Sequence, residues 1–114
     1  MAIQEHEIQK EIQVALSKYQ CTVFRANVAK VHLADGRWFS TGLPDGFFDL
    51  FGFNWRNNKI FFIEVKNAKG KPREDQIRFH CFLQKHFICH GIARSAEEAV
   101  SIVKNDMIGY GFDE

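Results

Sequence analysis

A strongly apolar stretch near the middle of the chain ends in two charged residues. In the segment FFIEVK (61–66), strand periodicity places Glu64 and Lys66 on one face and Ile63 and Val65 on the other. A carboxylate and an ammonium group therefore point the same way from an apolar strand. Charge in such a place costs solvation energy unless it is paired or bound to a metal ion. The pattern indicates either a simple ion pair or a functional site.

A third charge interrupts the preceding apolar segment, FFDLF (47–51), at Asp49. If residues 47–53 pair with residues 59–65, Asp49 and Glu64 converge near one end of the sheet. Two carboxylates at that distance repel each other, and a bound divalent cation usually offsets this repulsion. With Lys66 beside them as a charge partner, such a site has the parts needed to activate water on a phosphodiester.

The wider pattern resembles a known nuclease superfamily. The segments GLPDGFFDLFG (42–52) and IEVK (63–66), followed by Gln76, resemble the PD-(D/E)XK nucleases. Within that superfamily, residues from about 5 to 104 resemble the small stand-alone VRR-NUC domains of phages and bacteria. The resemblance implies a restriction-endonuclease-like α/β fold, with a mixed central sheet flanked by helices, and a DNA endonuclease activity that depends on Mg²⁺ or Mn²⁺.

The resemblance also implies roles for individual residues. Asp49, Glu64 and the carbonyl of Val65 would hold the metal, and Lys66 would stabilise or activate the nucleophile. Gln76 matches a helix glutamine that orients the lysine or a water on the metal.

Two carboxylates of this pattern have competitors nearby. Glu5, in an E-x-x-I-Q pattern, matches a first-helix carboxylate that supports a second metal or its waters, and Glu7 lies in the same turn. Asp45 is the literal aspartate of the superfamily's P-D, but it lies in a loop, whereas Asp49 lies on a predicted strand. We therefore favour Glu5 and Asp49.

Basic residues are concentrated in the middle of the chain. The formal net charge is +1, yet residues 56–85 contain eight basic and three acidic positions. This excess indicates either a phosphate-bearing partner or a solvated face. Arg25 resembles the family's arginine on the strand after the first helix, where it would contact the scissile phosphate, brace a carboxylate or form a cross-strand ion pair. We expect DNA contacts from Arg25, Lys69, Lys71 and Arg73.

Length and composition indicate what kind of protein carries these residues. The 114 residues, 46% hydrophobic and 14% aromatic, predict a single domain over 1–114 with its own core. No apolar run approaches the ~20 residues of a membrane-spanning helix, the N-terminus does not resemble a leader, and the three cysteines form no C-x-x-C. We expect a cytoplasmic protein, in a bacterial or phage-infected cell if the resemblance holds.

The elements that position these residues can be read from periodicity. We expect an amphipathic helix over 4–18, a strand over 21–28 and a hairpin over 30–40. The loop 41–46 leads into a strand pair over 47–66, beginning near Phe47. A helix from Pro72 to about 85 follows, and then a strand over 87–93. Ser95 and Glu98 form a capping box that opens a last helix, and the tail from about 105 frays.

The predicted order of elements is α-β-β-β-β-α-β-α in one α/β unit. The cysteine and histidine side chains have no predicted catalytic role. Cys81 and Cys89 lie among apolar residues and are expected to be buried. The histidines form no ligand-like pair in the sequence, so each is expected to be structural or exposed: His6, His32, His80, His86 and His90.

The oligomeric state follows from the resemblance and from the aromatic content. Stand-alone relatives imply a homodimer that cuts four-way (Holliday) junctions, since two symmetric cuts need two sites. Aromatic residues crowd the segment 47–55, as interface or as core: Phe47, Phe48, Phe51, Phe53 and Trp55. If they are core, Lys69, Lys71 and Arg73 line the DNA groove of a monomer. A catalytically silent DNA-binding subunit and a restriction-type nuclease acting on linear duplex remain alternatives.

Overall fold

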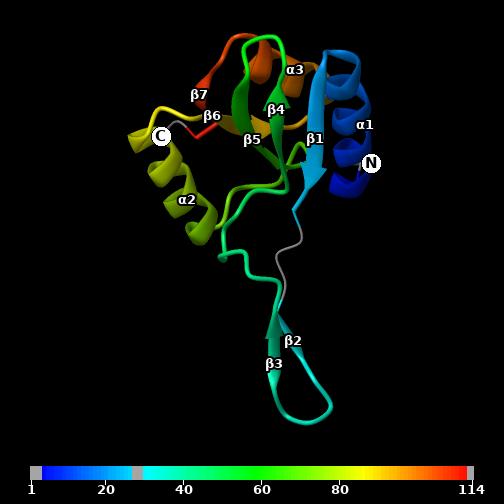
Figure 1. Ribbon diagram of the computed structural model, residues 1–114, viewed down its shortest axis with the longest axis vertical. Coiled ribbons are helices and arrows are strands. Elements are labelled where there is room, and N and C mark those ends of the chain that lie inside the picture. Colours follow the sequence, from blue (N-terminus) through cyan, green and yellow to red (C-terminus); the bar gives the residue numbers. More distant parts are fainter. Residues whose placement is uncertain (1–3, 27–29, 113–114) are drawn as a thin grey trace.

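The computed structural model describes residues 4–26 and 30–112 and contains a five-stranded sheet, flanking helices and a separate hairpin (Figure 1). In chain order the elements are α1 (Glu5–Lys18), β1 (Cys21–Arg25), β2 (Lys30–His32), β3 (Trp38–Ser40), β4 (Leu50–Asn54), β5 (Lys59–Val65), α2 (Glu74–Lys85), β6 (Cys89–Ala93), α3 (Ala96–Lys104) and β7 (Ile108–Tyr110).

The sheet is mixed, as predicted. Its strand order is β1-β4-β5-β6-β7, with antiparallel pairing among β1, β4 and β5 and parallel pairing among β5, β6 and β7. The pairing of β4 with β5 aligns Leu50 with Ile63 and Phe53 with Ile60. The predicted pairing of these segments is therefore confirmed, and it brings the residues preceding Leu50 next to Glu64.

One face of the sheet packs against α1 and α3. Apolar residues at helical spacing on α1 are buried there against the odd-numbered residues of β5. The main members of this core are Ile8, Ile12, Leu16, Leu50, Phe61, Ile63, Val65, Ala99 and Ile102. The predicted division of β5 into two faces is confirmed. Burial of Ile8, Ile12 and Leu16 fixes α1 on the sheet, and thereby places Glu5 near the end of β5 that bears Lys66.

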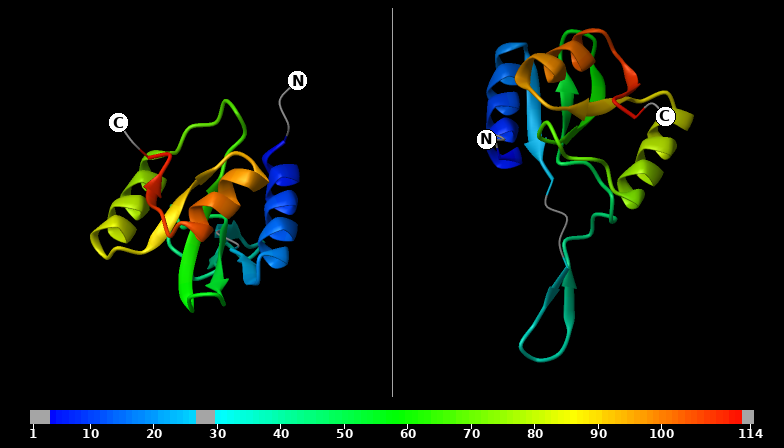
Figure 2. Two further views of the ribbon diagram at one scale, coloured as in Figure 1. Left: turned by 90° about the horizontal axis from the view of Figure 1, so that it is seen from above. Right: turned by 180° about the vertical axis from the view of Figure 1, so that it is seen from behind.

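The opposite face is only partly covered, because α2 lies over β6 and β7 (Figure 2). Half-buried and exposed rings remain over β1, β4 and β5, and we call them the aromatic face: Phe24, Phe51, Phe53, Trp55 and Phe62. Strand register aligns Phe24 with Phe51 and Phe51 with Phe62. Trp55 is 55% exposed and Phe24 45%. The crowded aromatic segment is thus divided: Phe48 is core, whereas Trp55 is exposed to solvent.

The start of β4 was predicted too early. The strand begins at Leu50, and the three residues before it belong to the loop. The chain turns there, with Gly46 at φ +88° and the Phe47 N–H donating to the Pro44 carbonyl. Asp49 therefore lies immediately before the strand, and the conformation of the loop sets the position of its side chain.

The start of α2 was also predicted too early. The helix begins at Glu74, with Arg73 as an extended N-cap, so Pro72 precedes the helix. The Gln76 side-chain oxygen accepts a hydrogen bond from the Arg73 N–H at 2.9 Å. This local bond satisfies a donor at the helix entrance and fixes the first turn of α2 at Arg73.

The tail is ordered, contrary to expectation. Residues Ile108–Tyr110 form β7, parallel to β6, and Phe112 stacks on Phe48 with ring centroids 5.5 Å apart. The described chain therefore has a strand after α3 that was not predicted, whereas its five strands before α2 are those of the predicted strand, hairpin and strand pair, which the order α-β-β-β-β-α-β-α undercounts by one. A three-residue strand has too little periodicity to be recognised from sequence. The Ser95 cap is confirmed, since its hydroxyl accepts the Glu98 N–H.

The predicted hairpin is present and forms a sheet of its own. We call residues 30–40 the hairpin arm; β2 and β3 pair antiparallel, and the Leu33 N–H donates to the Arg37 carbonyl at the tip. The arm projects from the end of the main sheet (Figure 1). The predicted strand over 21–28 ends at Arg25. Asn27 and Val28 lie outside the described residues.

The loop before Asp49 depends on a close approach at Gly46. A Cβ at this position would overlap the backbone carbonyl of Asp75 in α2, and φ is +88°. Gly42 has a similar φ of +91° but open space around it. We expect Gly42→Ala to lower the free energy of unfolding by about 1 kcal/mol and Gly46→Ala by a further ~1–3 kcal/mol. Urea unfolding measures both, and equal losses would contradict the close approach.

Candidate active site

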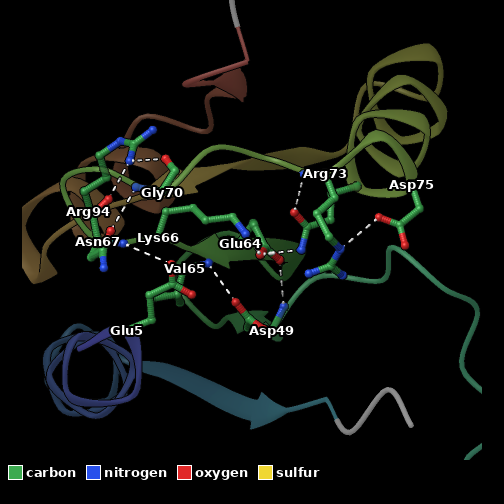
Figure 3. A network of polar contacts seen from close by, with 11 residues as sticks. Glu5, Asp49, Glu64, Val65, Lys66, Asn67, Gly70, Arg73, Asp75 and Arg94 are labelled. Carbon is green, nitrogen blue, oxygen red and sulfur yellow. Dashed lines mark hydrogen bonds and ion pairs between the residues drawn. The ribbon is translucent and has the colours of Figure 1, made fainter. Parts of the chain in front are cut away.

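A polar pocket lies where β4 begins and β5 ends, between α1 and α2 (Figure 3). Residues from β1, β5, α1, α2 and the segments next to them line it: Glu5, Gln9, Arg25, Ala26, Phe47, Asp49, Glu64, Lys66, Arg73 and Gln76. The sequence predicts nine residues that act through their side chains in catalysis, metal binding or DNA contact. Seven of these nine line the pocket. Lys69 and Lys71 are exposed and lie outside the lining.

Glu64 is the most enclosed charged group of the pocket, at 1% exposure. Its Oε2 accepts a hydrogen bond from Gln76 Nε2 at 2.7 Å and lies 3.3 Å from Lys66 Nζ. Its Oε1 accepts the Asp49 N–H at 3.3 Å. Donors from the loop before β4, from Lys66 directly after β5 and from α2 therefore hold both carboxylate oxygens.

Asp49 is bound to β5 in return. Its Oδ2 accepts the Val65 N–H at 3.0 Å, while Glu64 accepts the backbone N–H of Asp49 itself. This reciprocal pair of bonds fixes the two carboxyl groups relative to each other. Gln76 contacts Glu64 and not Lys66, so in this structure it orients the carboxylate. The metal-binding role of the Val65 carbonyl stays a prediction.

Both acids are shifted toward their neutral forms. Burial, followed by the charge of Asp49, raises the pKa of Glu64 from 4.5 to about 8, although Lys66 acts in the opposite direction. Burial also raises the pKa of Asp49, against hydrogen bonding from Val65. The charge of Lys66 therefore does not offset the effect of burial on these two carboxyl groups.

Only one carboxylate of each competing pair lines the pocket. Glu5 lines it and its Oε2 accepts the Asn67 N–H at 3.4 Å, whereas Glu7, in the same turn, is exposed and outside the lining. Asp49 lines the pocket, whereas Asp45 is exposed and outside it. The geometry thus brings Glu5 and Asp49 into contact with the residues of the site, and leaves Glu7 and Asp45 away from it.

Two arginines lie at the mouth of the pocket. Arg25, at the end of β1, and Arg73, at the N-cap of α2, are both exposed. Arg73 Nε lies 3.3 Å from Asp75 Oδ1. Exposed guanidinium groups beside two carboxylates suit an anionic ligand that reaches the pocket from solvent.

Sequence reasoning missed the arginine that holds the loop after Lys66. Arg94 Nη1 donates to the carbonyls of Asn67 and Gly70, at 2.6 and 2.7 Å, and Glu98 Oε1 accepts the Arg94 N–H. Arg94 follows the buried strand β6 directly, and a cation at the end of such a strand is the signal that could have indicated this role.

The sequence also missed a buried histidine pair. His80 Nδ1 and His90 Nε2 are 2.8 Å apart, and His90 Nδ1 lies 2.7 Å from the Ile88 carbonyl. Residues on a helix and a distant strand give no pattern that would predict this contact.

Cys89 is buried as expected, but Cys81 is exposed, because it lies on the outer side of α2.

The donor set at the pocket fits a hard divalent cation. In the described residues, no three His, Cys, Asp or Glu side chains are grouped as ligands. Mg²⁺ is commonly bound through one or two carboxylates and retains several waters, so Asp49 and Glu64 supply a suitable protein share. A dication would also compensate the charges that burial disfavours, which lowers the cost of ionising both acids.

The fold agrees with the resemblance found in the sequence. The structure is similar to a solved structure of a VRR_NUC domain, with a TM-score of 0.64 and 23% sequence identity, over 88% of this chain and 94% of that chain. The chain therefore has the fold of a VRR_NUC domain. No family model and no curated protein matches the sequence. Among the described residues, no helix is long and apolar enough to cross a membrane.

The pKa of Glu64 predicts a dependence of stability on pH in metal-free buffer. The folded protein retains a proton on Glu64 that the unfolded chain loses above about pH 4.5. The free energy of unfolding should therefore fall as pH rises from about 4.5 to 8, by at most about 1.4 kcal/mol per pH unit. Denaturant unfolding in EDTA measures the slope. Glu64→Gln should flatten it, and the exposed-site control Glu97→Gln should not; an unchanged slope in Glu64→Gln would contradict the assignment.

Proposed function

We propose that this protein is a DNA endonuclease dependent on Mg²⁺ or Mn²⁺ that hydrolyses phosphodiester bonds. The observation that carries the proposal is the joint placement of Asp49, Glu64 and Lys66 in one pocket, on the fold of a VRR_NUC domain. Two adjacent carboxylates that burial disfavours, next to an ammonium group and open to solvent, suit metal-assisted hydrolysis of an anionic substrate.

Each residue of the pocket has a distinct role in this proposal. Asp49 and Glu64 hold the metal ion, with the Val65 carbonyl as a further ligand, and Gln76 keeps Glu64 in its binding orientation. Lys66 lies 3.3 Å from Glu64 Oε2, where its charge can stabilise the negative charge that develops on the reacting oxygens. The chemistry that a bound Mg²⁺ or Mn²⁺ supplies is Lewis-acid polarisation of the phosphodiester and activation of water.

The remaining residues position substrate. Arg25 and Arg73 bind phosphate oxygens at the mouth of the pocket, and Glu5 supports the loop after β5 through Asn67. Lys69 and Lys71, exposed on that loop, add attraction for neighbouring phosphates. In this proposal the DNA is recognised through its backbone, and branched DNA such as a four-way junction is the favoured substrate.

Substitution of the carboxylates tests the proposal. We expect Asp49→Ala and Glu64→Ala to abolish cleavage of four-way junction DNA in Mn²⁺ and Mg²⁺ without loss of folding, since each removes a metal ligand and relieves repulsion. Asp45→Ala is the matched control and should retain activity. Gel assays with junction, flapped, splayed and linear DNA, with EDTA controls, measure this.

The same assay decides between the alternatives. Binding of junction DNA without metal-dependent cleavage would support a catalytically silent subunit. Cleavage of linear duplex at defined sequences would support a restriction-type enzyme. Wild-type activity in Asp49→Ala would remove Asp49 from the site.

We also propose that the protein acts as a homodimer formed through the aromatic face. Rings of this size remain partly exposed because α2 packs mainly over β6 and β7 and contacts β5 through Phe79 on Phe62, and an apolar patch on a sheet is suited to self-association. A C₂ pair would give two symmetric sites, as paired cuts of a junction require. Phe24 and Trp55, the most exposed members, would be the first rings buried.

Light scattering over a dilution series tests the dimer. We expect the wild type to be dimeric at micromolar concentration and Phe24→Glu to be monomeric, because the substitution puts a charge at the centre of an apolar contact. Val14→Glu, at a residue of α1 that is 55% exposed and lies outside the aromatic face, is the control and should remain dimeric. A monomeric wild type, with or without junction DNA, would contradict the proposal.

A further inference from the structure

The hairpin arm is inserted into the chain between two residues of the polar pocket. Ala26 and Phe47 both line the pocket, and the arm lies between them in the sequence. The Ala26 N–H donates to the Asp49 carbonyl at 2.8 Å, so the base of the arm is attached beside a proposed metal ligand. The arm then projects away from the sheet (Figures 1 and 2). A strand of DNA with a phosphate in the pocket would therefore pass next to the arm.

The arm presents large rings to solvent. Trp38 is 69% exposed and Phe39 is 54% exposed, and as neighbours on a strand they point to opposite sides of the hairpin. His32 is the register partner of Trp38 and stacks on it, with ring centroids 4.7 Å apart and an angle of 23° between the planes. His32 thus supports one side of the indole and leaves it as a flat, exposed platform.

The surroundings of this platform favour a nucleic acid over a protein partner. Arg25 and Arg73 are exposed at the mouth of the pocket, whereas Arg37, exposed on the arm, is ion-paired with Asp35 at 2.7 Å. Exposed aromatic rings, combined with cationic groups that bind the backbone, here Arg25 and Arg73 at the pocket, are the combination that binds unpaired bases. A second copy of the chain already has a separate apolar surface in the aromatic face, so the arm is not needed for dimer formation.

We propose that the arm recognises an unstacked base beside the cleaved phosphodiester, with Trp38 stacking on that base. The inference rests on the proposed nuclease function and refines its substrate class. DNA that offers an unstacked base next to the cut, either unpaired in a splayed end or a single strand or at the crossover of a branch point, binds both pocket and arm. A continuous duplex keeps its bases stacked on one another and binds the pocket alone.

Trp38 can report on its own environment. The chain contains two tryptophans, so Trp55→Phe leaves Trp38 as the single emitter. In EDTA, we expect single-stranded, splayed and four-way junction DNA to quench Trp38 emission and matched linear duplex to leave it unchanged. The three unpaired or branched forms, compared at equal length, distinguish a free strand end from a junction as the source of the base.

Substitution then measures the contribution of stacking. Trp38→Ala should weaken binding of single-stranded or branched DNA by about 5- to 100-fold and leave duplex binding within about twofold. Phe87→Ala, at an 80% exposed ring beyond α2 and outside the arm, is the matched control and should bind as the wild type does. Circular dichroism checks that each variant is folded.

The outcomes separate this inference from the proposed function. If metal-dependent cleavage occurs but Trp38 emission and the Trp38→Ala affinities do not depend on unpaired bases, the arm inference is overturned and the nuclease stands. If Trp38 stacks on DNA but no DNA is cleaved, the nuclease proposal fails and base recognition stands. If Trp38→Ala turns a dimer into a monomer and Trp38 emission follows protein dilution, the arm binds a second copy and the inference is overturned.

Discussion

The burial of one carboxyl group, that of Glu64, is the constraint on which the site depends. A charged or protonated carboxyl at 1% exposure is tolerated only with its oxygens bonded, and the donors come from three places along the chain. The Asp49 N–H, the Gln76 amide and the Lys66 ammonium surround it. Folding therefore brings the loop before β4 and the first turn of α2 to the end of β5, because Glu64 would otherwise remain unsatisfied.

The same arrangement explains the electrostatic state of the pocket. Burial raises the pKa of both Glu64 and Asp49, and the nearby charge of Asp49 raises the pKa of Glu64 further. A dication reverses these shifts because it interacts with both carboxylates at once. Under the proposed function, part of the free energy of metal binding is used to remove the proton that Glu64 retains without metal, so metal affinity depends on pH.

The aromatic residues show how a small domain divides its apolar surface. Phe48 and Phe61 are enclosed, Phe24 and Trp55 remain partly exposed on the sheet, and Trp38 is on the arm. A chain of 114 residues has a limited interior, so an aromatic content of 14% is shared between core and surface. The helices decide which rings are enclosed: α2 packs over β6 and β7 and leaves the other half of this sheet face open.

The sequence by itself determined the elements with strong local signals and the residues with unusual chemistry. Helical spacing predicted α1, the Ser95–Glu98 cap predicted α3, and charges within or at the end of apolar segments indicated Asp49, Glu64 and Lys66 as candidates. These are local properties of side-chain type and period, so one sequence suffices to detect them.

Only the tertiary structure decided which neighbours of each residue matter. It separated Asp49 from Asp45 and Glu5 from Glu7, which have the same chemistry and lie within one turn or loop. It also added β7 and the contacts of Arg94 with the loop carbonyls, whose partners are distant in the sequence. Short strands and long-range hydrogen bonds leave no periodic trace, because their stability comes from the surfaces against which they pack.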